Sequence, residues 1–195
     1  MELVRLGRTD LMVSRIALGC MSYGDPASGL HRWTLDEEAA APFFRAAVER
    51  GITFWDTANV YQSGTSEEYV GRAVMRFSRR DDIVLATKVW GRMHDGPTGG
   101  GLSRAAIHEQ CDASLRRLGT EHIDVYYIHR FDDTVAVEET MEALHDLVVA
   151  GKVRHLGASS MWAWQFAKLQ TAAAVNGMDR VLGHAGPVQP PQARG

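Results

Sequence analysis

Short apolar runs alternate with longer amphipathic runs along most of this chain. The apolar runs, which read as strands, cover residues 15–20, 52–56, 82–90, 123–129 and 153–159. The amphipathic runs, which read as helices, cover residues 34–51, 65–77, 103–118, 136–151 and 162–175. Five strands that alternate with five helices over mostly short connections predict parallel βαβ units with right-handed crossovers. Before the first unit, a polar turn at residues 7–10 predicts a short β-hairpin.

The ends of several helices carry recognisable signals. Thr34 is the expected N-cap of the first helix and Thr65 opens a capping-box-like sequence at the second. Gly51 and Gly119 are the expected stops of the first and third helices. Pro42 falls inside the first helix, where it predicts a kink or a late restart.

Two architectures fit this alternation, an open doubly wound sheet and a (β/α)₈ barrel. An open sheet that binds a dinucleotide predicts G-x-G-x-x-G after the first strand, and the sequence there, LGCMSYGDPASG, lacks that spacing. In a barrel, polar functional residues gather at the carboxyl ends of the strands. Asp56, Lys88, His129 and Ser159 each end a predicted strand. The fold class that we expect is therefore α/β, a partial (β/α)₈ TIM barrel with an N-terminal hairpin and about five strand–helix units.

Composition and charge narrow the range of possible functions. The chain has 195 residues, a net charge of −3 and a pI of about 6.2, so nothing indicates a nucleic-acid or membrane partner. The N-terminus has no apolar core typical of a secretory signal. Cys20 and Cys111 lie far apart, so a cytoplasmic, reducing setting is the simplest interpretation. The eight histidines are scattered, and we expect no metal site.

Four polar residues would meet at one rim if the strands that carry them are neighbours in a barrel. Singly, Asp56 is typical of a helix cap, Tyr61 of a packing aromatic and His129 of a structural histidine. Together with Lys88, they suggest reduction of a carbonyl. A phenol alone holds its proton too tightly to be an efficient donor at neutral pH, and an adjacent ammonium eases its release. Tyr61 would be the general acid, Lys88 its tuning group, Asp56 the partner of Lys88, and His129 the residue that orients the carbonyl.

The sequence resembles the aldo-keto reductase family over roughly residues 3 to 180. Four motifs carry the resemblance in the family's order, namely FWDTANVYQSGTSEEYVGRA, ATKVW, IDVYYIHRFDD and GKVRHLGASSMWAWQF. The resemblance implies a TIM-barrel oxidoreductase that uses NADPH without a Rossmann fold. It places Asp56, Tyr61, Lys88 and His129 in the four catalytic positions.

The resemblance also implies cofactor and substrate contacts. Ser159 matches the serine that contacts the nicotinamide carboxamide, and Ser160 stands where the family often has asparagine. Trp33 and Trp90 lie on loops that could line a hydrophobic pocket, although either could equally pack inside the protein. IHRFD and GASSMWAWQF look most like the bacterial and fungal branch that acts on aryl aldehydes and polyketide ketones. The expected partner is thus a small carbonyl compound.

Residues 181–195 depart from the family. This stretch, VLGHAGPVQPPQARG, reads as a loop or disordered end, where the family has a strand that ends in a glutamine. One choice of codons for these residues, read one base later, encodes SSAMQDQYNLLKRE, which looks like the missing reductase continuation. We therefore expect residues 1–180 to be a truncated aldo-keto reductase domain and 181–195 an aberrant tail after a frameshift. Because a complete barrel typically needs about 250 residues, the truncated chain should be inactive.

Two other functions stay open. One is a non-enzymatic subunit on the same scaffold that senses the cofactor or binds a partner. The other is a TIM-barrel lyase or isomerase in which Lys88 forms a Schiff base, which the placement of Asp56 and Tyr61 makes less favourable. The sequence leaves the oligomeric state and the physiological substrate open.

Overall fold

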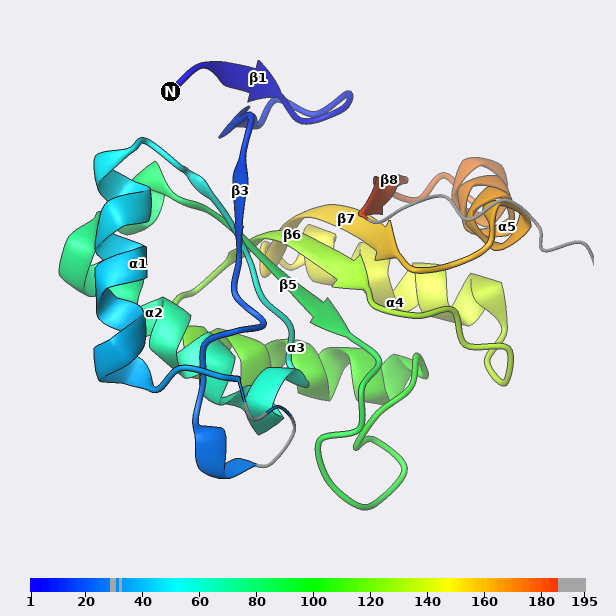
Figure 1. Cartoon of the computed structure of the whole chain (residues 1–195). Helices are drawn as coiled ribbons and strands as arrows, with labels where there is room; N and C mark the ends of the chain where they lie inside the picture. Colours follow the sequence, from blue (N-terminus) through cyan, green and yellow to red (C-terminus); the bar gives the residue numbers. More distant parts are fainter. Residues whose placement is uncertain (29–30, 32, 186–195) are drawn as a thin grey trace, which may run out of the picture.

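One parallel sheet organises the protein. The structure, a computed structural model, describes residues 1–28, 31 and 33–185 (Figure 1). Its strands are β3 (Ala17–Gly19), β4 (Phe54–Asp56), β5 (Val84–Val89), β6 (Ile123–Ile128), β7 (Val153–Ser159) and β8 (Val181–Ala185). They pair in chain order, and every pair is parallel. The fold is therefore part of a (β/α)₈ barrel, open between β3 and β8 within the described residues.

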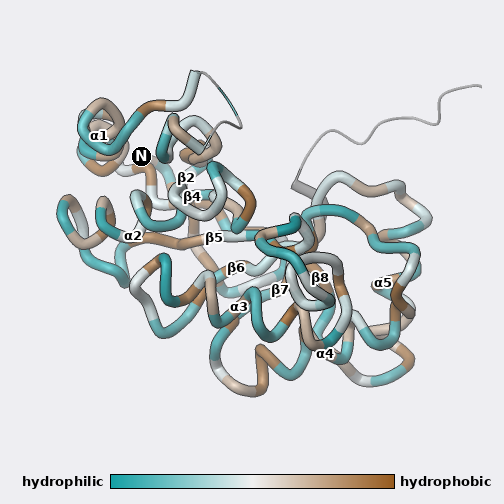
Figure 2. Tube along the Cα trace, turned by 90° about the horizontal axis from the view of Figure 1, so that it is seen from below, coloured by the Kyte–Doolittle hydropathy of each residue, from teal (hydrophilic) through white to brown (hydrophobic). Residues whose placement is uncertain are grey.

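Within the described residues, five α-helices connect the strands on one side of this sheet. They are α1 (Glu37–Glu49), α2 (Thr65–Phe77), α3 (Arg104–Leu118), α4 (Val137–Val149) and α5 (Ala163–Val175). In Figure 2 they form an arc outside the strands. The loops that the structure describes also contain the short 3₁₀ helices η1 (Pro26–Ser28), η2 (Tyr61–Gly64) and η3 (Arg80–Asp82). Among the described residues, none of the helices combines the length and the hydropathy that a membrane span requires.

Alternation along the strands divides the apolar side chains between two cores. The larger core lies between the sheet and the helices, and Trp55, Leu85 and Tyr126 are fully buried in it. The smaller core, on the opposite face of the sheet, is built around Ala86, Val125 and Tyr127. The second face would line the inside of a barrel.

The predicted hairpin is confirmed. Strands β1 (Leu3–Arg5) and β2 (Met12–Ser14) pair antiparallel, and Gly7 in the turn has a φ of 59°, which glycine adopts without strain. Leu6 and Leu11 pack on the smaller core. In Figure 1 the hairpin, dark blue, lies away from the arrowheads of β5 and β6, and thus covers the N-terminal end of the sheet.

The expected start of α2 at Thr65 is confirmed, but the expected caps of the first two helices, Thr34 and Thr65, are both wrong. The first helix is capped by Asp36, whose carboxylate accepts from the Ala39 backbone N–H at 2.9 Å, and not by Thr34. Helix α2 begins at Thr65, so its N-cap is Gly64. Pro42 lies within one uninterrupted helix, so the restart does not occur. Threonine and aspartate are both good caps, and local sequence does not separate candidates two residues apart.

The start of the predicted tail is a strand, which corrects our expectation of a loop. Strand β8 pairs with β7, with Leu156 opposite Val181 and Gly157 opposite Leu182. Val181 is 3% exposed in the larger core, and Leu182 contacts the smaller one. Val181 and Leu182 therefore pack against opposite faces of the sheet. The rest of the tail, residues 186–195, lies outside the described residues.

Candidate active site

Lys88 is at the centre of the candidate site. Alternation along β5 turns it to the inner face of the sheet, where it is 3% exposed. Its Nζ donates to Asp56 Oδ2 at 2.7 Å and to the Thr57 carbonyl oxygen at 2.7 Å, and it lies 3.3 Å from the Tyr61 hydroxyl oxygen. An ammonium group has three protons, so these three oxygens account for all of them.

Asp56 ends β4, beside Gly19 on one neighbouring strand and Ala86 on the other. Burial raises the pKa of the Asp56 carboxyl, and the Lys88 ammonium opposes that shift. Its Oδ1 atom is buried and has no hydrogen-bond partner among the residues that the structure describes. The ion pair with Lys88 thus offsets part of the desolvation cost of burying the Asp56 carboxylate.

Tyr61 reaches Lys88 from the loop between β4 and α2. Its ring meets the His129 ring edge to face, with centroids 5.7 Å apart and an interplanar angle of 83°. The Lys88 Nζ lies 4.9 Å from the centroid of the Tyr61 ring. The phenol is thus held between the ammonium and the imidazole.

His129 follows the last residue of β6, and its backbone N–H donates to the Val89 carbonyl at 2.9 Å. Burial, then the positive charges of Lys88 and Arg130, lower the pKa of His129 to about 4. The imidazole is therefore neutral at physiological pH and has one N–H to donate. Its Nδ1 atom is buried without a hydrogen-bond partner in the described part of the chain.

Ser159 and Ser160 lie at the end of β7, on the edge of the sheet that carries His129. Lys88 pairs with Tyr127 and Tyr127 with Gly157, so His129 and Ser159 each lie two residues beyond this row. The two hydroxyl oxygens are 3.2 Å apart. A hydroxyl both donates and accepts, which suits the amide of a nicotinamide ring. The donor chemistry of this pair thus fits the expected cofactor.

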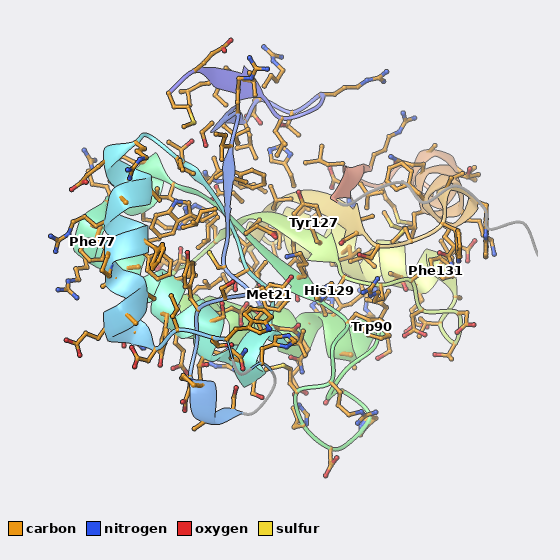
Figure 3. The ribbon with its side chains drawn as sticks, viewed as in Figure 1. Met21, Phe77, Trp90, Tyr127, His129 and Phe131 are labelled. Carbon is orange, nitrogen blue, oxygen red and sulfur yellow. The ribbon has the colours of Figure 1, made fainter. Side chains whose placement is uncertain are left out.

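The two tryptophans expected at the pocket lie on different loops. Trp90 follows β5 and lines a surface cleft of about 600 Å³ together with Phe131 and the loop at residues 100–103. Figure 3 shows Trp90 and His129 at the carboxyl ends of their strands, with Phe131 further along the same edge. Trp33, on the loop after β3, is 52% exposed and stacks on His31 with ring centroids 4.4 Å apart.

Three contributors to the site escaped the sequence-based prediction. The Thr57 carbonyl binds Lys88, Asn59 donates from Nδ2 to the Gly91 carbonyl at 3.5 Å, and Gln62 is buried directly after Tyr61. The first is a backbone group, and the other two act across long sequence separations. Only the proximity of Asn59 and Gln62 to Tyr61 could have drawn attention to them.

Comparisons with known proteins match most of this chain to a single family. The profile of the Aldo/keto reductase family matches residues 15–179. Aldo-keto reductase AMT2 from Alternaria alternata is 45% identical, over 88% of this chain and 53% of that protein. Versiconal hemiacetal acetate reductase from Aspergillus parasiticus is 42% identical, over 93% of this chain and 57% of that protein. The chain spans about half the length of the curated relatives that it matches.

A solved structure agrees with the fold. Aldo-keto reductase AKR11C1 from Bacillus halodurans, in its holo form, superposes with a TM-score of 0.76 at 36% sequence identity. The match covers 88% of this chain and 54% of that one. The similarity therefore extends over most of the described residues.

Proposed function

Because this chain belongs to the aldo/keto reductase family, we propose that its site reduces the carbonyl group of small aldehydes or ketones to an alcohol. The observation that carries the proposal is the position of the Lys88 ammonium, within hydrogen-bond distance of both Asp56 and Tyr61. A buried ammonium beside a phenol is an arrangement suited to proton transfer.

Each residue has a distinct part in this mechanism. NADPH, when bound, supplies the hydride, and Ser159 and Ser160 would hold its carboxamide. Tyr61 donates its proton to the carbonyl oxygen as negative charge develops there, and the Lys88 ammonium stabilises the phenolate that remains. Asp56 fixes Lys88 in place. The neutral imidazole of His129 donates a hydrogen bond that orients the carbonyl oxygen beside the phenol.

We further propose that the substrates are aryl or polyketide-like carbonyl compounds. One similar protein is named versiconal hemiacetal acetate reductase, and another, from Phanerodontia chrysosporium, is named aryl-alcohol dehydrogenase [NADP(+)] and is 40% identical. Trp90 and Phe131, which follow β5 and β6 and line one cleft, offer aromatic rings to a flat apolar substrate. The second name also supports NADPH over NADH as the cofactor.

A cytoplasmic location is part of the proposal, since Cys20 and Cys111 are free thiols.

We propose too that the six described strands do not support turnover by themselves. A TIM barrel closes with eight strands, and here the inner face between β3 and β8 is not enclosed by the described sheet. Substrate and cofactor would therefore keep much of their contact with water.

The experiment compares two proteins. One is the chain itself, and the other is a chimera in which residues 1–180 precede the C-terminal half of Aldo-keto reductase AMT2. Oxidation of NADPH by an aryl aldehyde should occur in the chimera and be absent in the chain. Tyr61→Phe in the chimera should lower kcat by about 10²–10⁴-fold, the range of a general acid. A chimera that binds NADPH without turnover would refute the reductase proposal and support a cofactor sensor.

A further inference from the structure

The backbone directly after the proposed proton donor adopts an unusual conformation. Gln62 has φ 47° and ψ 45°, and Ser63 has φ 55° and ψ 34°. Both lie in the left-handed region, which glycine adopts freely and residues with a side chain rarely adopt. Two successive residues of this kind require surrounding contacts that hold them there, and such strain concentrates at functional sites.

The contacts come from the side chain of Gln62, which is 1% exposed. Its Oε1 accepts a hydrogen bond from the Ser28 hydroxyl, and its Nε2 donates to the Thr34 hydroxyl. Both partners belong to the segment between β3 and α1, about thirty residues earlier in the chain. The amide thus joins the Tyr61 loop to a separate loop. Ser63, by contrast, is exposed.

Backbone packing reinforces the same junction. A Cβ atom added to Gly24 would lie 2.6 Å from Gln62 Cβ, so only glycine lets the two segments approach this closely. The Thr65 hydroxyl accepts from the Asp25 N–H and donates to the Gln62 carbonyl, both at 2.8 Å. The two loops are therefore in contact at Gln62 and again at Thr65.

The loop that Gln62 contacts carries Trp33, and Thr34 is the next residue. We propose that Gln62 is a positioning residue, which holds the Tyr61 phenol and the Trp33-bearing loop at a fixed separation through its bonds to Ser28 and Thr34. This inference rests on the proposed function and extends it. The loop that carries Trp33, an expected pocket residue, and the group that gives the substrate a proton would then move together.

Comparing two substitutions to glycine separates this role from relief of backbone strain. Gln62→Gly and Ser63→Gly both remove a side chain from a left-handed position, but only the first removes the two hydrogen bonds. Gln62→Met keeps the strain and most of the buried volume while it loses the amide. Thr34→Val removes one partner and leaves Gln62 intact, which keeps the test informative should a Gln62 variant fold poorly.

The first readout needs no turnover. The 195-residue chain is labelled with fluorotyrosine and fluorotryptophan, and the ¹⁹F resonances of Tyr61 and Trp33 are assigned with Tyr61→Phe and Trp33→Phe. Gln62→Gly, Gln62→Met and Thr34→Val should shift or broaden both resonances, and Ser63→Gly should leave both unchanged. Equal changes in Gln62→Gly and Ser63→Gly, or a change in only one of the two resonances, would overturn the proposal.

The second readout is kinetic and uses the chimera. Gln62→Gly and Gln62→Met should lower kcat by about tenfold or more, since a small misplacement of a reacting group is costly. The dissociation constant for NADPH should be unchanged, and Ser63→Gly should keep its kcat within about twofold of the parent. If the two resonances move together and the chimera is inactive, the positioning role stands and the reductase proposal fails. Unchanged kcat in both Gln62 variants would overturn the positioning role.

Discussion

Lys88 holds a positive charge in a place that little water reaches, so its stability depends on the three oxygens around it. Asp56 is the charged one of the three, and its own side chain is 28% exposed. Removing either partner leaves the other with a desolvation cost and no compensating charge. Breaking this buried pair is therefore expected to cost more free energy of unfolding than breaking an ion pair at the protein surface.

Lys88→Met tests that difference. We expect the free energy of unfolding to fall by about 2 kcal/mol, because Asp56 loses its counter-charge, and reductase turnover in the chimera to disappear. The control is Lys152→Met, which breaks the 2.5 Å pair with Asp112, whose side chains are 37% and 42% exposed. That change should cost under about 1 kcal/mol in urea unfolding. Equal losses in the two variants would contradict the distinction.

His129 predicts a pH dependence of stability. Its pKa in the folded protein is about 4, below the ordinary value of 6.5, because burial and the Lys88 charge oppose protonation. Between these values the unfolded chain binds a proton that the folded chain does not, so acid favours unfolding. The contribution is complete above pH 6.5 and is lost as the pH falls towards 4.

The measurement is the free energy of unfolding from pH 7 to pH 4 for the parent chain and for His129→Gln, which cannot titrate. The parent should lose on the order of 2 kcal/mol more than the variant over this range. If the two proteins lost the same free energy of unfolding as the pH fell, the pKa of His129 would be the same in the folded and unfolded chains.

At the scale of elements, the pairing of β6 with β7 depends on one glycine. A Cβ atom added to Gly157 would lie 2.3 Å from Cδ1 and 2.4 Å from Cε1 of Tyr127, so the ring lies directly over this position. Burial, and then the charge of Asp56, raise the pKa of Tyr127, so its phenol stays protonated beneath the site. The strands meet at this close contact, just below the row that carries His129 and Ser159.

Gly157→Ala should therefore lower the free energy of unfolding by about 2–3 kcal/mol, because the Tyr127 ring must leave its place. Gly19→Ala is the control, since a Cβ atom there meets nothing within 4 Å. It should change stability by less than about 0.5 kcal/mol in the same unfolding experiment. Comparable losses in both would show that the ring moves aside freely.

Periodicity in the sequence was sufficient to predict strands β3 to β7 and helices α1 to α5, because each of them buries one face or stripe in a regular pattern. The N-terminal hairpin, the helix start at Ser103 and the stop at Gly119 follow local rules and are confirmed. Strand β8 was missed because its burial depends on two residues and on a neighbour already in place. The positions of Asp56, Lys88 and His129 at one rim were predictable because each residue lies near the end of a predicted strand. The contacts of Gln62 were not predictable, because they join segments about thirty residues apart and produce no pattern in the local sequence.

At the scale of the whole molecule, the family profile stops matching at residue 179, and the sequence beyond it has a testable genetic explanation. We propose that a shift of reading frame separates residues 181–195 from a reductase-like continuation. The source gene, sequenced from codon 176 onward, should then encode the glutamine and further strand–helix units in the alternative frame. A gene without such a frame would contradict the proposal.

The agreement between strand order and chain order has a consequence for synthesis. Each strand from β4 to β8 pairs with the strand that was made just before it, so no strand must wait for a distant partner. On the ribosome, the sheet can therefore grow at its newest edge as each strand–helix unit emerges. The cluster around Lys88 could assemble as soon as β6 has been made, well before the last residues of the chain are added.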